Sequence, residues 1–241
     1  MISRIYRDNP FYGYRRITVE LQKIEKLNIN RKRVRRVMCK LGITAIYPKR
    51  NLSKSKEKHK KYPYLLKGLK IERANQVWAT DITYIRVNGA YLYLSAIIDH
   101  YSRKVLSWRL SNTIDKRFCI ETLNESLLKY GTPELFNSDQ GSQFTSNKFL
   151  KLLEDKETIK ISMDSKGRAL DNIYIERLWR SLKYENIYLN DYKDMKECKE
   201  GIRRYFKFYN GKRWHQEIDY RTPDEVYFDG LRLQQGFHKA C

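Results

Sequence analysis

The feature that most constrains the fold is a pair of β-rich runs joined by Asn88-Gly89. Residues 76–87 and 90–99 are rich in β-branched and aromatic side chains. Asn-Gly between two such runs is a strong signal for a β-hairpin with a two-residue turn. A third β-rich run covers residues 104–110, so the chain is predicted to form a meander of three strands here.

Helices and strands alternate after this meander. The expected elements are a helix at 115–130, a strand at 134–138, a helix at 146–155 and a strand at 158–162. A polar loop then precedes a long helix from about 172 to 188, for which Asp171 is a suitable N-cap. A last helix near 194–209 is followed by an irregular tail. The pattern predicts an α/β fold in which a mixed five-stranded sheet is flanked by helices.

The first 47 residues show a different, helical pattern. Two short helices are expected within 11–42, with Asn30 capping the second helix and Gly42 ending it. Their apolar stripes are Ile17, Leu21 and Ile24 in the first helix, and Val34, Val37, Met38 and Leu41 in the second. The outer face of the second helix is basic and consists of Arg31, Lys32, Arg35 and Arg36. This is the plan of a helix-turn-helix, whose second helix contacts DNA.

The positive charge is concentrated at the start of the chain. Residues 1–75 contain 22 Lys and Arg against 5 Asp and Glu, whereas residues 76–241 contain 27 against 23. So steep an asymmetry indicates a polyanionic partner, of which nucleic acid is the leading candidate. A basic surface kept for solubility is the alternative.

The chain is therefore divided into four regions. Residues 1–47 form the helix-turn-helix-like region, 48–75 a basic linker, 76–190 the α/β core, and 191–241 a C-terminal helix and tail. The lysine-rich part of the linker, 48–62, is expected either to follow DNA phosphates or to act as a flexible tether.

Cysteine and hydropathy patterns place the protein in the cytoplasm. Cys39, Cys119, Cys198 and Cys241 form no CxxC pair and have no histidine at zinc spacing, so free and mostly buried thiols are expected. No apolar run approaches the roughly 20 residues of a membrane span, and the first ten residues do not resemble a secretory signal.

Three acidic residues occupy unusual places in the predicted core. Asp81 lies inside the β-rich run 78–84, Asp139 ends a short strand before Gly141, and Glu176 lies one turn into a helix. Aspartate is depleted in strands, and a buried carboxylate needs compensation. Converging carboxylates repel one another unless cations neutralise them, and their hard oxygens suit Mg²⁺ or Mn²⁺. Taken singly, each acid could equally be a turn former or a surface charge.

Longer sequence runs decide between these interpretations. The runs 75–84 (NQVWATDITY), 137–146 (NSDQGSQFTS) and 167–185 (GRALDNIYIERLWRSLKYE) resemble the integrase-like transposases of two-frame bacterial insertion sequences. The family is the one numbered three in the insertion-sequence nomenclature, and the resemblance is to its second-frame protein. Further matching stretches are 99–112, the segment containing Tyr12-Gly13-Tyr14-Arg15-Arg16, and the tail from 209 to 223.

The resemblance implies a ribonuclease H-like core and an Asp-Asp-Glu triad formed by Asp81, Asp139 and Glu176. It implies two Mg²⁺ or Mn²⁺ ions, cleavage that frees a 3′-hydroxyl at a transposon end, and transfer of that end to another phosphodiester. It also implies a basic residue seven positions after the glutamate, here Lys183, which would hold a phosphate. Gln143, Arg15 and Arg16 are further candidates for DNA contact.

The same resemblance implies double-stranded DNA partners, namely the terminal inverted repeats and the target. A homo-oligomer on DNA is expected, with the upstream-frame protein as a possible further partner, at the bacterial nucleoid. The chain begins close to its basic segment, so it is expected to lack the upstream frame itself.

Two departures from the family pattern matter. The spacing between Asp139 and Glu176 is one residue longer than usual, and we place the extra residue in the polar joint 154–158. We therefore expect Glu176, and neither Asp164 nor Asp171, to face the two aspartates closely enough to share two ions. The usual tryptophan after Asp99 is His100 here, interpreted as a packing or surface substitution.

Three other functions remain open at this point. A retroviral-type integrase would bring an N-terminal His/Cys zinc module, and no such module is seen in the sequence. A ribonuclease H-type nuclease would not need the basic front segment. A non-catalytic DNA-binding regulator, which competes for transposon ends, needs no triad.

Overall fold

The structure, a computed structural model, describes residues 1–46, 62–164 and 172–238, with side chains up to residue 233. The backbone divides into two compact units, residues 1–57 and 58–241, which are described separately below. The predicted lysine-rich linker lies outside the described residues as far as residue 61. Residues 62–75 belong to the second unit and are hydrogen-bonded within it, for instance through Leu65 N–H to Ser162 Oγ at 3.0 Å.

The first unit is a bundle of three short helices. They are α1 (Ile2–Asp8), α2 (Tyr14–Lys23) and α3 (Arg31–Lys40). Ile5, Ile17, Leu21, Val34 and Met38 form its buried core. The predicted helix pair is thus present, but α1, which supplies Ile5 to this core, was not expected from the sequence.

The ends of α3 are capped as the sequence predicts. The Asn30 side chain accepts a hydrogen bond from Lys32 N–H at 2.7 Å, and Gly42 adopts a φ of +66° after the last turn. For two residues, the assignment to the apolar stripes is wrong. Ile24 follows the end of α2 and Leu41 is the C-cap of α3, and both are exposed because the helices stop before them.

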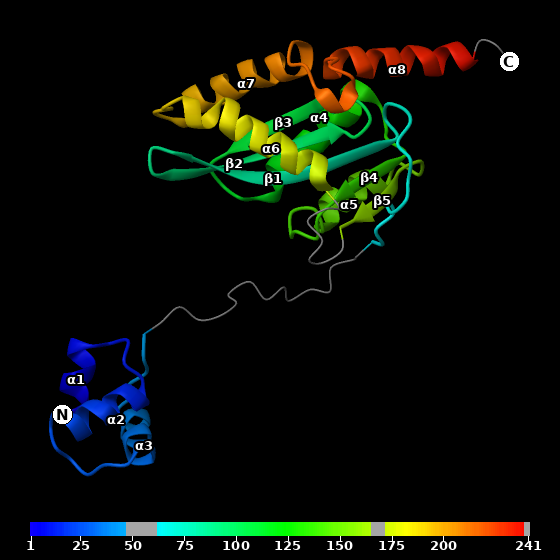
Figure 1. Cartoon of the computed structure of the whole chain (residues 1–241). Coiled ribbons are helices and arrows are strands. Elements are labelled where there is room, and N and C mark those ends of the chain that lie inside the picture. The colour runs from blue at the N-terminus through cyan, green and yellow to red at the C-terminus, as the bar shows by residue number, and fades with distance from the viewer. Residues whose placement is uncertain (47–61, 165–171, 239–241) are drawn as a thin grey trace. The chain divides into compact units, whose positions relative to one another are not determined.

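The second unit is built on a mixed five-stranded sheet (Figure 1). The strand order is β3-β2-β1-β4-β5, with β1–β2 and β2–β3 antiparallel and β1–β4 and β4–β5 parallel. The strands are β1 (Val77–Val87), β2 (Ala90–Asp99), β3 (Val105–Ser111), β4 (Leu135–Ser138) and β5 (Lys160–Met163). Asn88 and Gly89 both have positive φ, as a type I′ hairpin turn requires. The predicted meander and the mixed sheet are confirmed.

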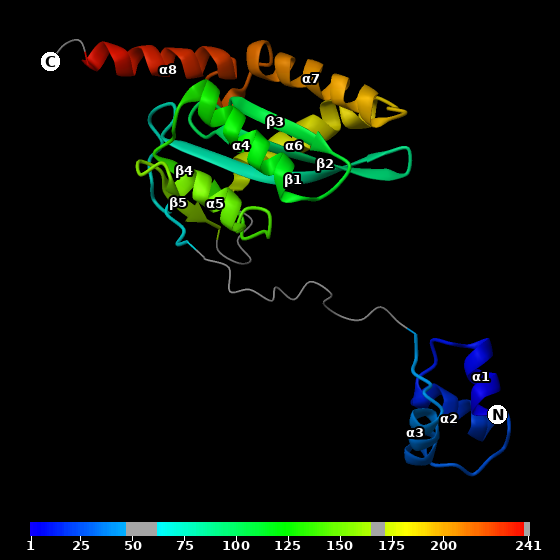
Figure 2. The ribbon, with the colours of Figure 1, turned by 180° about the vertical axis from the view of Figure 1, so that it is seen from behind.

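Helices cover both faces of this sheet, as Figures 1 and 2 show from opposite sides. On one face, α4 (Lys116–Tyr130) and α5 (Asn147–Glu154) pack on a cluster that includes Trp78, Leu123 and Phe136. On the other, α6 (Ile173–Glu185) and α7 (Met195–Gly211) pack on a cluster that includes Leu94 and Leu178. A short 3₁₀ turn, η2 (Ile187–Leu189), joins α6 to α7.

The chain forms a further helix after residue 222, so the irregular tail predicted for this segment is wrong. A 3₁₀ turn, η3 (Gln216–Ile218), leads into the helix α8 (Pro223–His238). Thr222 and Glu225 form a capping box: Thr222 N–H donates to Glu225 Oε2 at 2.8 Å, and Glu225 N–H donates to Thr222 Oγ1 at 3.3 Å. Tyr227 of this helix is fully buried, and its hydroxyl donates to Asn75 Oδ1 at 2.9 Å.

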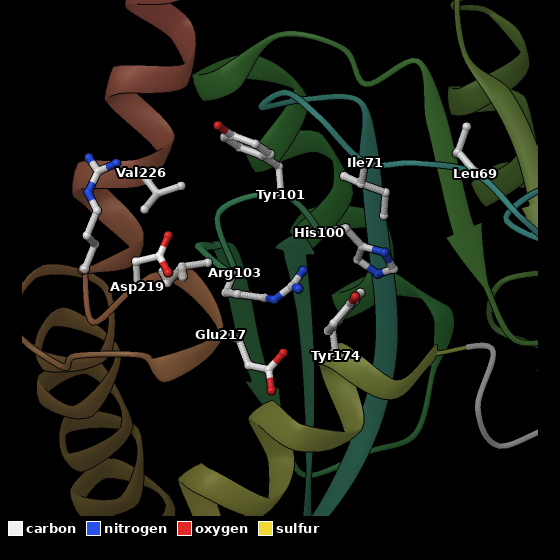
Figure 3. A pocket seen from close by; sticks show the side chains of 11 residues that line it. Leu69, Ile71, His100, Tyr101, Arg103, Tyr174, Glu217, Asp219 and Val226 are labelled. Atoms are coloured by element: carbon white, nitrogen blue, oxygen red, sulfur yellow. The ribbon is translucent and has the colours of Figure 1, made fainter.

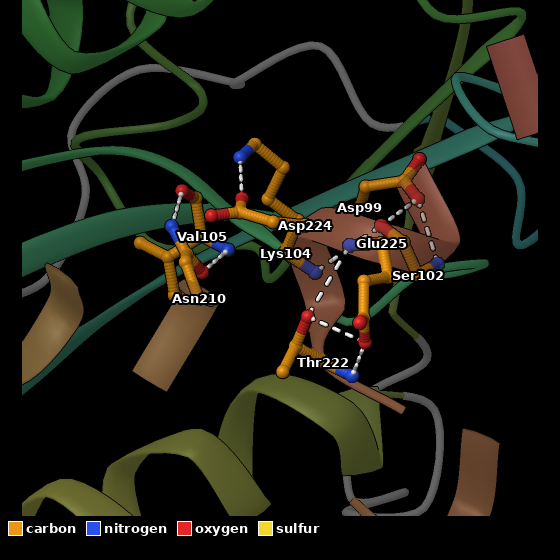
Figure 4. A network of polar contacts seen from close by, with 8 residues as sticks. All are labelled: Asp99, Ser102, Lys104, Val105, Asn210, Thr222, Asp224 and Glu225. Carbon is orange, nitrogen blue, oxygen red and sulfur yellow. Dashed lines mark hydrogen bonds and ion pairs between the residues drawn. The ribbon is translucent and has the colours of Figure 1, made fainter. Parts of the chain in front are cut away.

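A buried polar network holds α7 and α8 against the turn between β2 and β3 (Figure 4). Asn210 donates to Val105 C=O at 2.8 Å and accepts from Val105 N–H at 2.9 Å. Lys104 is buried and forms an ion pair with Asp224 of α8. These contacts fix the chain after α6 to the sheet edge. None of the helices in the described residues is long and apolar enough to cross a membrane.

Candidate active site

Asp81 lies in the middle of β1, opposite Ala96 of β2. Its Oδ2 accepts a hydrogen bond from Trp179 Nε1 of α6 at 2.9 Å. Burial raises the pKa of Asp81 to about 6, although the Trp179 bond opposes the rise. The charges of Asp139 and Glu176 raise this pKa further, so both carboxylates lie within electrostatic range of Asp81.

Asp139 follows directly after β4 and lies beside Asp81. The parallel pair β1–β4 matches Ala79 with Asn137, and each aspartate is two residues further along its strand. Positions two apart share a face, and neighbouring strands are about 4.8 Å apart, so the two side chains leave the same region of the sheet. Burial also raises the pKa of Asp139.

Gly141 shapes the exit from this strand. Its N–H donates to Asp139 Oδ1 at 2.8 Å. A Cβ at position 141 would lie 2.9 Å from the same oxygen, closer than real Cβ contacts allow. A side chain at position 141 would therefore displace the Asp139 carboxylate from this position.

Glu176 lies in the first turn of α6, which packs on the sheet through Ile175, Leu178, Trp179 and Leu182. Its side chain is exposed and makes no hydrogen bond or ion pair within the described part of the chain. The helix begins after Asn172, which is its N-cap residue. Asp171, the predicted cap, lies outside the described residues.

The three carboxylates lie near one another but do not surround one common metal position. Within the described residues, no three His, Cys, Asp or Glu side chains come close enough together to hold a metal ion. That Glu176 faces the two aspartates closely enough for the three to share two ions stays a prediction. Asp81 and Asp139 lie in or directly after adjacent strands, whereas Glu176 lies on an exposed helical turn. The three carboxylates carry like charge, and this repulsion favours a separation of Glu176 from the aspartates.

The donor set nevertheless fits a hard divalent cation. It consists of carboxylate oxygens, the ligands that Mg²⁺ and Mn²⁺ prefer. No Lys or Arg in the described residues forms an ion pair with any of the three, although the chain is strongly basic. Their negative charge is thus left for a partner from outside the chain.

Asp164 is the acid that competes with Glu176 for the neighbourhood of Asp139. It follows β5, and its N–H donates to Ser138 C=O at 2.9 Å. Its Oδ1 accepts from Asn137 Nδ2 at 2.7 Å, so part of its hydrogen-bonding capacity is used within the sheet edge. Which of the two acids completes the site stays a prediction. The joint 154–158 forms the end of α5 and the turn into β5.

The candidate DNA-contact residues fall into two groups, one in each unit. In the second unit, Lys183 lies in the last turn of α6, and Gln143 lies in the turn after Asp139, where its Oε1 accepts from Ser142 Oγ at 3.3 Å. Both are partly exposed. Lys183 is seven residues after Glu176, so the two share one side of the helix.

In the first unit, the predicted basic residues are all exposed. These are Arg15, Arg16, Arg31, Lys32, Arg35 and Arg36. The guanidinium groups of Arg15 and Arg35 lie 5.9 and 5.8 Å from the Tyr14 ring, so α2 and α3 present their cations together. Hydrogen bonding and charge from Arg15 lower the pKa of Tyr14, with smaller contributions from Arg35 and Arg31. Cations of both helices thus lie around one tyrosine, and we call the exposed basic residues of α2 and α3 the cationic surface.

Sequence reasoning missed Trp179, the residue that orients Asp81. It lies three positions after Glu176, and this i, i+3 spacing places it on the side of α6 next to the acid. The spacing was readable, but a tryptophan on the buried face of a helix is ordinarily only a packing residue.

Family models and known proteins resemble the chain over most of its length. A model described as "Integrase core domain" matches residues 71–169, a second of that description matches 157–223, and an "HTH-like domain" matches 1–51. The putative transposase InsK for insertion sequence element IS150 of Escherichia coli K12 is 35% identical over 93% of this chain and 80% of its own length. The transposase for insertion sequence element IS904 of Lactococcus lactis is 31% identical over 89% and 86%.

Solved structures share the fold at low identity. The catalytic core domain of HTLV-2 integrase, in its dimeric form with magnesium, has a TM-score of 0.51 and 19% identity over 64% of this chain and 97% of that one. A chain of the simian T-cell lymphotropic virus intasome has a TM-score of 0.56 and 15% identity over 94% and 74%.

Proposed function

This chain belongs to the IS3 family of insertion-sequence transposases, and we propose that it cleaves DNA at the 3′ ends of an insertion sequence and transfers those ends to another phosphodiester. We propose Asp81, Asp139 and Glu176 as the residues that hold two Mg²⁺ or Mn²⁺ ions for this chemistry. The observation that supports the assignment is that Asp81 lies in β1 and Asp139 directly follows the parallel neighbour β4, with the charges of Asp139 and Glu176 both acting on Asp81.

The chain's own part in the reaction is to present oxygen donors in a fixed arrangement. Trp179 Nε1 orients Asp81, the Gly141 N–H orients Asp139, and the packing of α6 sets the reach of Glu176. When bound, divalent ions at such a site activate a water or a 3′-hydroxyl and stabilise the leaving oxygen. No side chain needs to form a covalent bond with the DNA.

Binding of the DNA is divided between the two units in this proposal. The cationic surface of α2 and α3 would dock the terminal inverted repeats, and Lys183 and Gln143 would hold the strand beside the carboxylates. A solved chain of similar fold is part of a viral intasome. We propose that this chain also acts as a homo-oligomer, on the bacterial nucleoid in the cytoplasm, with the upstream-frame protein as a further partner.

A strand-transfer assay tests the reaction. Labelled duplexes carrying the element's two ends, which lie on either side of this coding sequence, are incubated with the full chain and either Mg²⁺ or EDTA. We expect nicked 3′ ends and joined products with Mg²⁺ alone. Specific binding of the ends without any product under either condition would contradict the enzyme assignment and favour a regulator.

A salt titration tests the docking surface. Each phosphate contact contributes about 0.9 to the slope of log K against log salt, so replacing Arg35 and Arg36 together by Ala should lower the slope by roughly 2. Replacing Arg4 and Arg7 of α1 by Ala removes the same charge elsewhere in the unit. Equal loss of slope in both double variants would show general attraction and no docking surface on α3.

A further inference from the structure

Two hollows of the second unit differ in charge. The pocket that includes Tyr174 of α6 (Figure 3) is lined by two arginines and two acids, so its ionised groups balance. A hollow of about 460 Å³ between β3, α4 and α7, here called the α7 groove, is lined by one acid and five cations. The cations are Arg109, Lys129, Lys199, Arg203 and Lys207. A hollow lined by one sign of charge attracts a partner of the opposite sign, here a polyanion.

The α7 groove contains the whole charge surplus of the core and C-terminal region. Residues 76–241 contain 27 Lys and Arg against 23 Asp and Glu, a surplus of four. Removing the five cations and one acid of the groove leaves 22 of each sign, so the rest of these residues is neutral. A basic charge kept for solubility would be interspersed over the surface, whereas this charge is gathered in one place.

The acids of the chain do not neutralise the α7 side of the groove. Lys199 and Lys207 are exposed and form no ion pair within the described part of the chain. Between them, Arg203 shares Glu200 with Arg204, at 2.9 and 3.9 Å. The cations from β3 and α4 likewise share the single acid of the lining. Positive charge therefore remains for a partner from outside the chain.

The three cations of α7 form a row. Lys199, Arg203 and Lys207 are spaced by four residues, so they lie on one side of the helix with a rise of about 6 Å between neighbours. Asn210 holds α7 against β3 through its bonds to Val105 N–H and C=O (Figure 4). Since β3 is the edge strand here, the row lies beside a fixed sheet edge. It presents a line of positive charge that needs no rearrangement.

The groove offers charge but little apolar surface. Its aliphatic and phenyl side chains, Val105, Leu106 and Phe206, are each 3–4% exposed. The centre of a protein–protein interface is formed by apolar and aromatic groups, which this surface does not supply. A second copy of the chain would bring cations against cations. A DNA duplex, in contrast, carries one negative charge per about 1.7 Å of its axis and needs only cations.

The residues already considered for DNA contact in the second unit lie elsewhere. Neither Lys183 nor Gln143 lines the groove, and none of the three carboxylates does. In the strand order, β2 separates β3 from β1, which bears Asp81. Binding at the groove would therefore add DNA contacts that none of these residues supplies.

We propose that the α7 groove binds the phosphate backbone of duplex DNA, independently of its sequence. The proposal rests on the proposed function for the choice of DNA among polyanions. Lys199, Arg203 and Lys207 each contact a phosphate, and phosphate contacts carry no sequence information. Asn210, the amide side chain of the lining, is already engaged with Val105.

Chemical protection of the two unpaired lysines tests the proposal on the wild-type chain. The full chain is acetylated briefly in EDTA, alone, with a duplex that lacks the element's ends, or with polyglutamate of equal total charge. Mass spectrometry reports the acetylation of each lysine. We expect the duplex to slow acetylation of Lys199 and Lys207 at least fivefold, while Lys193 and Lys212 outside the groove change less than twofold. Polyglutamate should protect much less, because a flexible chain loses more freedom on binding than a stiff duplex.

A matched pair of triple variants locates the contact. The groove variant replaces the three cations of the α7 row by Ala. The control variant replaces Lys193, Arg204 and Lys212 by Ala; these cations are exposed and lie in or beside α7 but do not line the groove. Each phosphate contact contributes about 0.9 to the slope of log K against log salt, so the groove variant should lose roughly 3 in slope and the control less than about 1. The first unit contributes equally in all the chains compared.

Three results would overturn the proposal. They are acetylation of Lys199 and Lys207 that the duplex leaves unchanged, equal protection by polyglutamate, which would favour an acidic protein segment, and equal loss of slope in both triple variants. Strand transfer at the element's ends in Mg²⁺ is measured on the same wild-type preparation. Transfer without protection of the two lysines would refute the groove and leave the proposed function intact, whereas protection without transfer would do the reverse.

Discussion

Asp81 and Asp99 are acids at strand positions of the same sheet, the first partly and the second fully buried, yet their surroundings differ. Asp99 Oδ1 accepts from Asn75 N–H at 2.9 Å, and its Oδ2 accepts from Ser102 N–H and Ser102 Oγ at 2.9 and 2.7 Å. Asp81 accepts two bonds, one from the Trp179 side chain and one from the backbone of Ile82. Burial raises the pKa of both. Donors of the chain itself satisfy the Asp99 carboxylate. Lone pairs of the Asp81 carboxylate remain for a partner from outside the chain.

The comparison separates a structural acid from a functional one. Asp99 ties the β2–β3 turn to the segment before β1, whereas Asp81 contributes negative charge next to Asp139 and Glu176. The same conservative substitution should therefore have opposite consequences for folding and for activity at the two positions.

The largest effect should be on the reaction. Asp81→Asn, Asp139→Asn and Glu176→Gln keep shape and remove charge, and each should reduce strand transfer by roughly a thousand-fold, or about 4 kcal/mol of transition-state stabilisation. Asp164→Asn is the matched control because it changes a neighbouring acid in the same way. If Asp164→Asn is inactive and Glu176→Gln active, the third carboxylate must be reassigned.

The next effect should be on folding. Asp99→Asn replaces one of two accepting oxygens by a donor that faces another donor, so it should destabilise the second unit by about 2 kcal/mol. All four tryptophans, Trp78, Trp108, Trp179 and Trp214, lie in that unit. Tryptophan fluorescence during urea unfolding therefore measures its stability alone. Unaltered stability would mean that the bonds to Asp99 contribute little.

The smallest effect should have the opposite sign. The pKa of Asp81 is raised from 3.8 to about 6, so ionisation destabilises the metal-free fold, by up to about 3 kcal/mol when it is complete. Removing the charge with Asp81→Asn should stabilise the protein in EDTA at pH 7, by on the order of 1 kcal/mol after the weaker bond from Trp179 is included.

The pH dependence of this gain supplies its own control. Below the unfolded pKa near 3.8, wild-type Asp81 is protonated in both states and the substitution should change little. The gain should appear as pH rises through about 6. A gain of equal size at pH 3.5 and pH 7 would mean that the charge is not its cause.

Much of the second unit could be predicted because its signals are local. Asn88-Gly89 marks the hairpin, and the alternating pattern after it gives the order of helices and strands. The helix α8 was missed although Thr222 and Glu225 have capping-box spacing and Pro223 suits a first helical position. Its buried face depends on tertiary contacts such as that of Tyr227 with Asn75, which no local pattern contains.

Some features of the candidate site could likewise be predicted from the sequence and others could not. Asp81 and Asp139 stand out in the sequence because acids are rare in buried strands, and the parallel β1–β4 pair places them together. The role of Trp179 could not be predicted, because its bond to Asp81 joins segments far apart along the chain. The position of Glu176 relative to the aspartates depends on a side-chain conformation that spacing alone does not determine.

Counting bound Mn²⁺ by electron paramagnetic resonance tests the central claim most directly. The full chain in complex with end DNA should bind two Mn²⁺ ions. Asp81→Asn, Asp139→Asn and Glu176→Gln should each lose at least one, while Asp164→Asn should bind both. Unchanged Mn²⁺ binding in the three triad variants would contradict the claim that these carboxylates are the metal ligands.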